Sequence, residues 1–204
     1  MIVSSPLSNN AAPITPSALR SRGAAILAFA GFGAWWAGSA LRDAPLPLVE
    51  AGYLLVAAIT LALLFAAICL LRSSQGLKQA AETSSLPRRR TAGIFIAVLV
   101  AEVIAINFAA LLLASHHLRS GLLPLIAIIV GLHFYPLARL FRTPYYDITA
   151  TVMTLAGVVG LAALLAGCPT PSTLAAVAAV CAFTLWATAF AAWQRSREAI
   201  GRAR

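Results

Sequence analysis

Charged side chains are scarce in this sequence, and acidic ones are the scarcest of them. Only 10% of the 204 residues are charged, whereas about a quarter of a typical soluble domain is charged. Hydrophobic residues make up 61% of the chain. This balance excludes an ordinary soluble globular domain.

Motifs that carry chemistry are absent as well. The chain has no His-Glu-x-x-His, no Gly-x-Ser-x-Gly and no glycine-rich phosphate loop. Cys69, Cys168 and Cys181 are odd in number and predict no disulfide framework. The adjacent His116 and His117 point in different directions, with no Cys, Asp or Glu close in sequence, so we predict no metal and no cofactor. An enzyme is therefore the least favoured functional class.

What the chain has instead is a set of long apolar runs, each close to the roughly 20 residues that a helix needs to cross a bilayer. A β-barrel would need apolar and polar residues to alternate, and runs such as residues 54–59 do not alternate. Because a chain in lipid must satisfy its backbone polar groups internally, the runs predict an all-α polytopic membrane bundle. Its six predicted spans are residues 23–41, 49–71, 91–115, 122–140, 148–167 and 172–193.

Basic residues gather on one side of this predicted bundle. All but Arg42 and Arg119 of the 15 basic residues fall on the side that holds both termini. By the positive-inside rule this side, with both termini, is cytoplasmic. The bias explains the net charge of +9 without nucleic acid, and it predicts anionic membrane lipid as a partner. A chain rich in Ala and Leu that uses Arg in preference to Lys is typical of a bacterial inner membrane.

Outside the spans, the sequence predicts two cytoplasmic tails. Residues 1–22 are rich in Ser, Pro, Asn and Ala and lack helical periodicity, which predicts a mobile tail. Residues 23–193 form the predicted transmembrane domain, and residues 194–204 form a basic tail. Asp147 is predicted to be the N-cap of the fifth span.

Two polar residues interrupt the third span. Glu102 lies about ten residues into it, near the bilayer midplane by the helical rise of about 1.5 Å per residue, and Asn107 follows. A charged group at that depth costs roughly 2.5–3.5 kcal/mol. Glu102 therefore needs a compensating partner, a neutral protonation state or a function.

The fourth span holds the most specific local pattern, in residues 131–142. It places the ionisable His133 beside Pro136, which cannot donate a backbone hydrogen bond and predicts a kink, while Gly131 adds local freedom. Counted along the helices, the depths of Glu102 and His133 differ by about 6 Å, so a contact between them is feasible. Transporters use a broken helix beside a titratable group at their binding sites, although ordinary spans also contain prolines.

Two arginines, Arg139 and Arg142, follow at the cytoplasmic end of this span. Their spacing puts them on one face if the helix continues past the predicted kink. They are candidates to clamp a phosphate, and snorkelling toward anionic lipid headgroups is the simpler interpretation.

Residues 131–146 read GLHFYPLARLFRTPYY. This string resembles the G-L-H-F-x-P-L-A signature of small uncharacterised bacterial six-span inner-membrane proteins. The resemblance covers the string and the number of spans. It implies a six-helix fold and a location in the bacterial envelope, directs attention to His133, Pro136 and Arg139, and implies no mechanism.

Two functional classes remain close. Small-solute or proton-linked transport would use Glu102, Asn107 and His133 as a polar patch in mid-membrane, whereas a non-catalytic scaffold would bind lipid or a partner through its small-residue faces and basic loops. Transport is favoured because ionisable residues within a membrane are functional by default. Six spans make a small permeation unit, so we expect a homodimer. The lack of a visible repeat between the two halves of the chain weakens an inverted-repeat interpretation.

Overall fold

The computed structural model describes residues 16–75, 86–116 and 118–202, and in these residues it is all-helical. Six helices are long and apolar enough to cross a membrane, as the sequence predicts. They are α1 (Pro16–Leu41), α2 (Leu46–Gln75), α3 (Leu86–Ser115), α4 (Leu122–Phe141), α5 (Tyr145–Leu165) and α6 (Thr170–Arg202), with a short 3₁₀ helix, η1 (Arg119–Gly121), before α4.

The first and last helices extend beyond their predicted bounds. Residues 16–22, which the sequence assigns to the N-terminal tail, are the first turns of α1, and residues 194–202 of the predicted C-terminal tail continue α6. Pro16 is pre-organised for the first helical position, and the Arg, Glu and Ala residues after Trp193 have high helix propensity. Polarity therefore marks where a membrane would end, but it does not end these helices. The predicted mobility of residues 1–15 lies outside the described residues.

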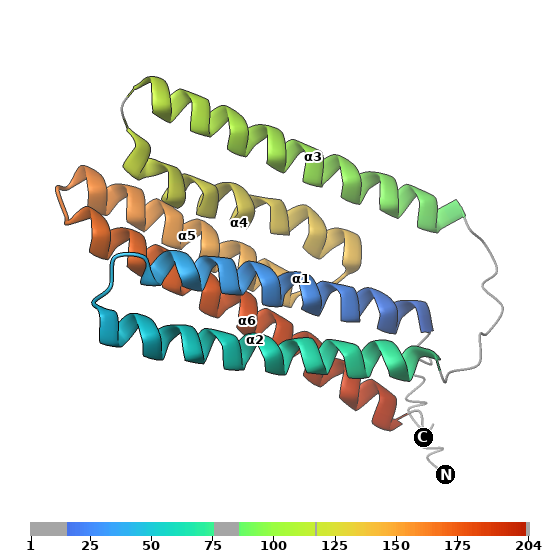
Figure 1. Cartoon of the computed structure of the whole chain (residues 1–204). Coiled ribbons are helices and arrows are strands. Elements are labelled where there is room, and N and C mark those ends of the chain that lie inside the picture. The colour runs from blue at the N-terminus through green and yellow to red at the C-terminus, as the bar shows by residue number, and fades with distance from the viewer. Residues whose placement is uncertain (1–15, 76–85, 117, 203–204) are drawn as a thin grey trace, which may run out of the picture.

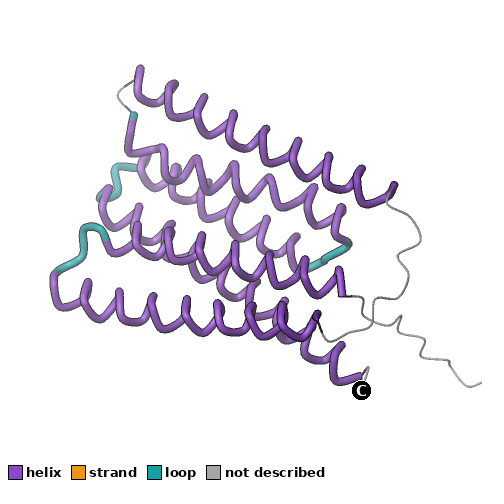
Figure 2. Tube along the Cα trace, turned by 45° about the vertical axis from the view of Figure 1, so that its right-hand side comes forward, coloured by secondary structure: helices purple, strands orange, loops and turns teal. Residues whose placement is uncertain are grey.

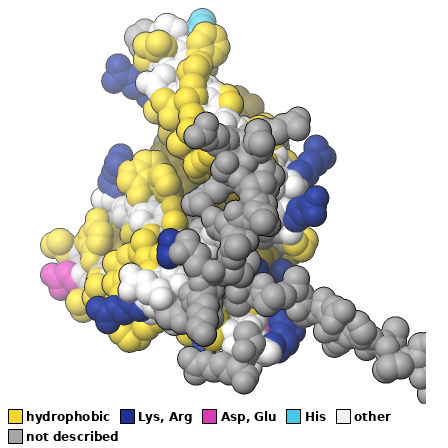
Figure 3. Space-filling view, turned by 90° about the vertical axis from the view of Figure 1, so that its right-hand side faces the viewer, with side chains coloured by type: hydrophobic (Ala, Val, Ile, Leu, Met, Phe, Trp, Pro, Cys, Tyr) yellow, Lys and Arg dark blue, Asp and Glu magenta, His cyan; other side chains and the backbone are white. Residues whose placement is uncertain are grey.

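Consecutive helices run in opposite directions, and except for α2 and α3 they lie side by side, so the start of α1 and the end of α6 are at the same end of the bundle (Figure 1, Figure 2). That end, which we call the arginine-rich end, includes Arg20 and Arg22 of α1, Arg139 of α4 and Arg195 of α6. Figure 3 faces it and shows basic side chains around its rim. The charge asymmetry predicted from sequence is thus present in the fold.

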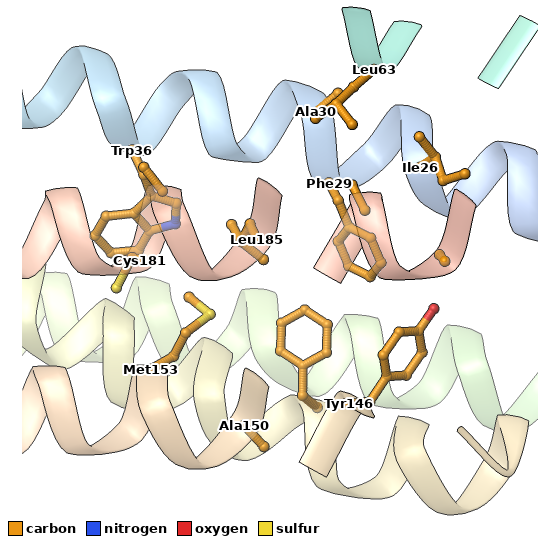
Figure 4. Packing of buried hydrophobic residues seen from close by; sticks show 14 of the residues in the cluster. Ile26, Phe29, Ala30, Trp36, Leu63, Tyr146, Ala150, Met153, Cys181 and Leu185 are labelled. Carbon is orange, nitrogen blue, oxygen red and sulfur yellow. The ribbon is translucent and has the colours of Figure 1, made fainter. Parts of the chain in front are cut away.

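The core is formed by α1, α2, α4, α5 and α6. Phe29, Tyr146, Met153 and Cys181 point into it from α1, α5 and α6, and the rings of Phe29 and Tyr146 meet edge to face at 5.6 Å (Figure 4). Small residues bring helices together. A Cβ at Gly33 of α1 would stand 2.5 Å from Cδ1 of Trp186, so this glycine leaves room for the indole ring of α6.

α3 is the least buried helix of the bundle. Only 6% of its most apolar window is buried inside the structure, against 22% to 39% for the other five helices. It packs mainly against α4 and against the neighbouring η1 (Figure 1). α3 is thus attached to the bundle mainly through α4, and the residues at that contact decide how firmly it is held.

Candidate functional site

The structure joins α3 to α4 through an ionisable pair. Nδ1 of His133 contacts Oε2 of Glu102, and both side chains are largely buried, with 11% and 13% of their surfaces exposed. His133 lies just past the middle of α4, and Glu102 lies near the middle of α3. This is the contact that the sequence analysis treats as feasible, and it gives Glu102 the compensating partner that its position requires.

Both partners titrate, so the charge of the pair depends on its protons. With one proton shared, as imidazolium and carboxylate or as imidazole and carboxylic acid, the pair is neutral overall. A second proton leaves a net positive charge and removes the carboxylate that attracts the imidazolium, whereas loss of the shared proton leaves a net negative charge. An uncompensated charge is costly in an apolar environment, so loss of either ionised partner would leave the other unfavourably placed.

Asn107 does not join this pair, contrary to the predicted polar patch. Its side chain is exposed, and its amide donates a 2.8 Å hydrogen bond to the carbonyl oxygen of Val103 one turn earlier in α3. Residues five apart on a helix point about 140° away from each other, so Asn107 cannot share the face of Glu102. Helical periodicity alone could have separated the two residues.

The fourth helix is continuous through Pro136, so the helix is not broken there, and the predicted kink stays a prediction. Gly131 serves packing between helices. A Cβ at this position would stand 2.6 Å from the backbone nitrogen of Thr154 and 3.0 Å from the carbonyl oxygen of Ala150, both in α5. Gly131 thus brings α4 against α5 on one side, while His133 two residues later reaches α3.

Arg139 and Arg142 do not share a helical face. The helix ends at Phe141, and Arg142 adopts a left-handed conformation with φ of 50°. The amide of Thr143 donates a 2.9 Å hydrogen bond to the carbonyl oxygen of Ala138, which closes the helix end. Both arginine side chains are exposed, so each is available to anionic lipid, but the phosphate clamp predicted from helical spacing loses its basis.

Two features at the start of α5 were not predicted from the sequence. The N-cap is Pro144 and not Asp147. Asp147 lies within the first turn, where the positive end of the helix dipole still stabilises its carboxylate. Tyr145 stacks against Arg195 of α6, whose guanidinium lies 4.7 Å from the centre of its ring. No local sequence signal connects residues fifty positions apart.

No group of three or more His, Cys, Asp or Glu side chains that could hold a metal ion occurs in the described part of the chain. The comparisons with known proteins add no identification, since no family model, curated protein or solved structure matches this chain. The resemblance of residues 131–146 to the six-span inner-membrane signature therefore stays a prediction, and what the described residues show is a bundle of six membrane-length helices.

Proposed function

We propose that this chain is a multi-pass protein of the bacterial inner membrane that couples movement of a small solute to protons at the Glu102–His133 pair. The observation that carries the proposal is the buried contact of a carboxylate with an imidazole between two membrane-length helices. Ionisable residues in such segments are rare and costly, and they mark proton relays and solute pathways. In this proposal the arginine-rich end is cytoplasmic.

The weak attachment of α3 supplies the moving part. The contacts of α3 with α4 include the ionisable pair and an apolar contact between Phe95 and Phe141, whose rings lie 6.1 Å apart. In lipid, apolar contacts favour the association of two helices only weakly, because the lipid tails offer equally apolar contacts. A second proton on the pair therefore removes the main specific attraction between the helices, so α3 separates from α4 when the proton is taken up.

A non-catalytic scaffold is the second candidate, and the exposure of α3 favours it. Ile96, Ile104, Phe108 and Leu111 each expose more than half of their surface. A partner helix that covered this face would make α3 a docking element and the Glu102–His133 pair a structural link. In that case removal of the pair lowers stability and partner binding without affecting any solute.

The test is luminal pH in proteoliposomes that hold a pH-sensitive dye. A proton gradient directed into the lumen is applied. Short carboxylic acids, amino acids, monosaccharides and monovalent cations are then added in turn. The transport proposal expects one class to change the rate of proton entry at least tenfold over empty liposomes, and Glu102→Gln to abolish that change. Asn107→Gln is the matched control, since it alters a polar residue of the same helix that does not contact His133.

Retention of full solute-dependent proton flux in folded Glu102→Gln protein would exclude the pair as the proton site. If wild-type protein moves protons with none of the solute classes while Glu102→Gln loses a co-purifying protein, the scaffold proposal replaces transport.

A further inference from the structure

A second polar site lies at the arginine-rich end, away from the Glu102–His133 pair. Here the ring of Tyr145 on α5 is stacked by the guanidinium of Arg195 on α6, 4.7 Å from its centre. Arg22 of α1 lies two helical turns before Phe29 on the same helix face, and Phe29 packs against Tyr146, whose ring meets that of Tyr145. Two cations from different helices thus lie at the same end of the bundle, on either side of the Tyr145–Tyr146 pair.

The platform beneath these arginines is rigid. Tyr146 is buried against Phe29 of α1, and its ring meets the ring of Tyr145 at a nearly perpendicular angle of 88°. One turn into α5, the hydroxyl of Thr149 donates to the carbonyl oxygen of Tyr145 at 3.1 Å and lies 2.6 Å from the hydroxyl of Thr188 on α6. α1, α5 and α6 therefore pack against one another at this end of the bundle.

The positive charge at this site has no internal counter-ion in the described residues. The carboxylates nearest in sequence are Asp147, on α5, and Glu198, one turn after Arg195 on α6. The ion pair found in the described residues joins His133 to Glu102, and neither Asp147 nor Glu198 forms one with an arginine there. An external anion can therefore neutralise both guanidinium groups.

We propose that the site formed by Arg22, Tyr145 and Arg195 binds the phosphate headgroup of an anionic phospholipid. Planar guanidinium groups form charge-assisted, bidentate hydrogen bonds with phosphate oxygens, and tyrosine is enriched at the depth of lipid headgroups. The site lies at the ends of membrane-length helices, which is where such headgroups are found.

The flanking surface distinguishes a lipid from free phosphate. Further along α5 from the arginine-rich end, Ile148 exposes 66% of its surface, and Leu155, seven residues later on the same face, exposes 56%. Acyl chains can pack on these apolar side chains, whereas inorganic phosphate gains nothing from them. The proposal is independent of proton coupling, since it involves neither Glu102 nor His133.

The experiment measures retention of phosphatidylglycerol by the purified full chain in detergent, counted by native mass spectrometry over a lipid titration. We expect Arg22→Gln and Arg195→Gln each to raise the apparent Kd for the lipid roughly tenfold, because each removes charge-assisted hydrogen bonds to phosphate. Arg197→Gln is the matched control. Arg197 also stacks on an aromatic ring, 5.0 Å from the centre of Trp193, but that ring is on its own helix and not at the site.

Further variants and ligands keep the result decisive. Arg195→Lys keeps the charge and loses the planar fork, so it should bind more weakly than wild type even if Arg195→Gln fails to fold. Phosphatidylcholine should bind at least tenfold more weakly than phosphatidylglycerol, and millimolar inorganic phosphate should not displace the lipid. Displacement by inorganic phosphate would overturn the lipid assignment in favour of a free-anion site. An equal loss in Arg197→Gln would show diffuse charge attraction and overturn the site itself.

Discussion

Replacement of Gly131 by alanine tests whether close packing of α4 on α5 positions His133. Gly131 is buried, and a Cβ there would stand 2.4 Å from Oγ1 of Thr154 and 2.6 Å from its backbone nitrogen. The hydroxyl could rotate away, but the backbone of α5 cannot. The two helices must therefore move apart by a few tenths of an ångström or more, which shifts the segment that carries His133.

The expected magnitude follows from two opposing terms. Forcing a methyl group into a packed interface costs typically about 1–3 kcal/mol. Alanine gains about 1 kcal/mol over glycine in helix propensity. A matched control removes the second term, since Gly31 is also within a helix but has no atom within 4 Å of the position of a Cβ. Gly131→Ala should therefore be about 1–3 kcal/mol less stable than Gly31→Ala.

The assay is reversible unfolding in mixed micelles, with the free energy of unfolding obtained for wild type and both variants. Gly31→Ala is expected to be neutral or slightly stabilising, and Gly131→Ala is expected to be less stable than this control. Equal free energies of unfolding for the two variants would refute the inference that α5 backbone atoms limit the space at Gly131.

Three further predictions use the same assay. Arg142→Gly should be about 1 kcal/mol more stable than Arg142→Ala, because φ is 50° there and alanine is strained in that region; equal stabilities would contradict the left-handed helix end. In a double-mutant cycle, Thr149→Val and Thr188→Val should show a coupling of about 0.6 kcal/mol and at most about 1.7 kcal/mol, and zero coupling would argue against their 2.6 Å contact. Asn107→Leu should change stability by less than about 0.5 kcal/mol, since its amide bonds only its own helix, and a larger loss would indicate a missed partner.

The number and approximate bounds of the helices could be predicted because lipid imposes a length and a composition on each span. The ends could not, because α6 continues through polar residues to Arg202 and α1 begins at Pro16. Hydropathy reports where apolar solvent ends, whereas helix ends depend on propensity and capping. The left-handed conformation of Arg142, a residue that rarely adopts it, illustrates the second limit.

The Glu102–His133 contact was accessible from sequence because both residues are costly in apolar surroundings and lie at similar depths. The lateral arrangement of helices was not, since depth along a helix says nothing about which helix lies beside it. The peripheral position of α3 and the stacking of Arg195 on Tyr145 depend on that arrangement. The role of Gly131 likewise needed the position of α5, because a glycine in a span is equally compatible with a bend and with close packing.

The central claim is that Glu102 and His133 share protons as one unit that holds α3 against α4. The most direct measurement is an infrared titration of the Glu102 carboxyl band in lipid nanodiscs, assigned by its loss in Glu102→Gln and compared between wild type and His133→Gln. We predict that replacing His133 shifts the pH at which the carboxyl band changes, and that Asn107→Gln leaves that pH unchanged. A carboxyl band that titrates identically with and without His133 would contradict the claim.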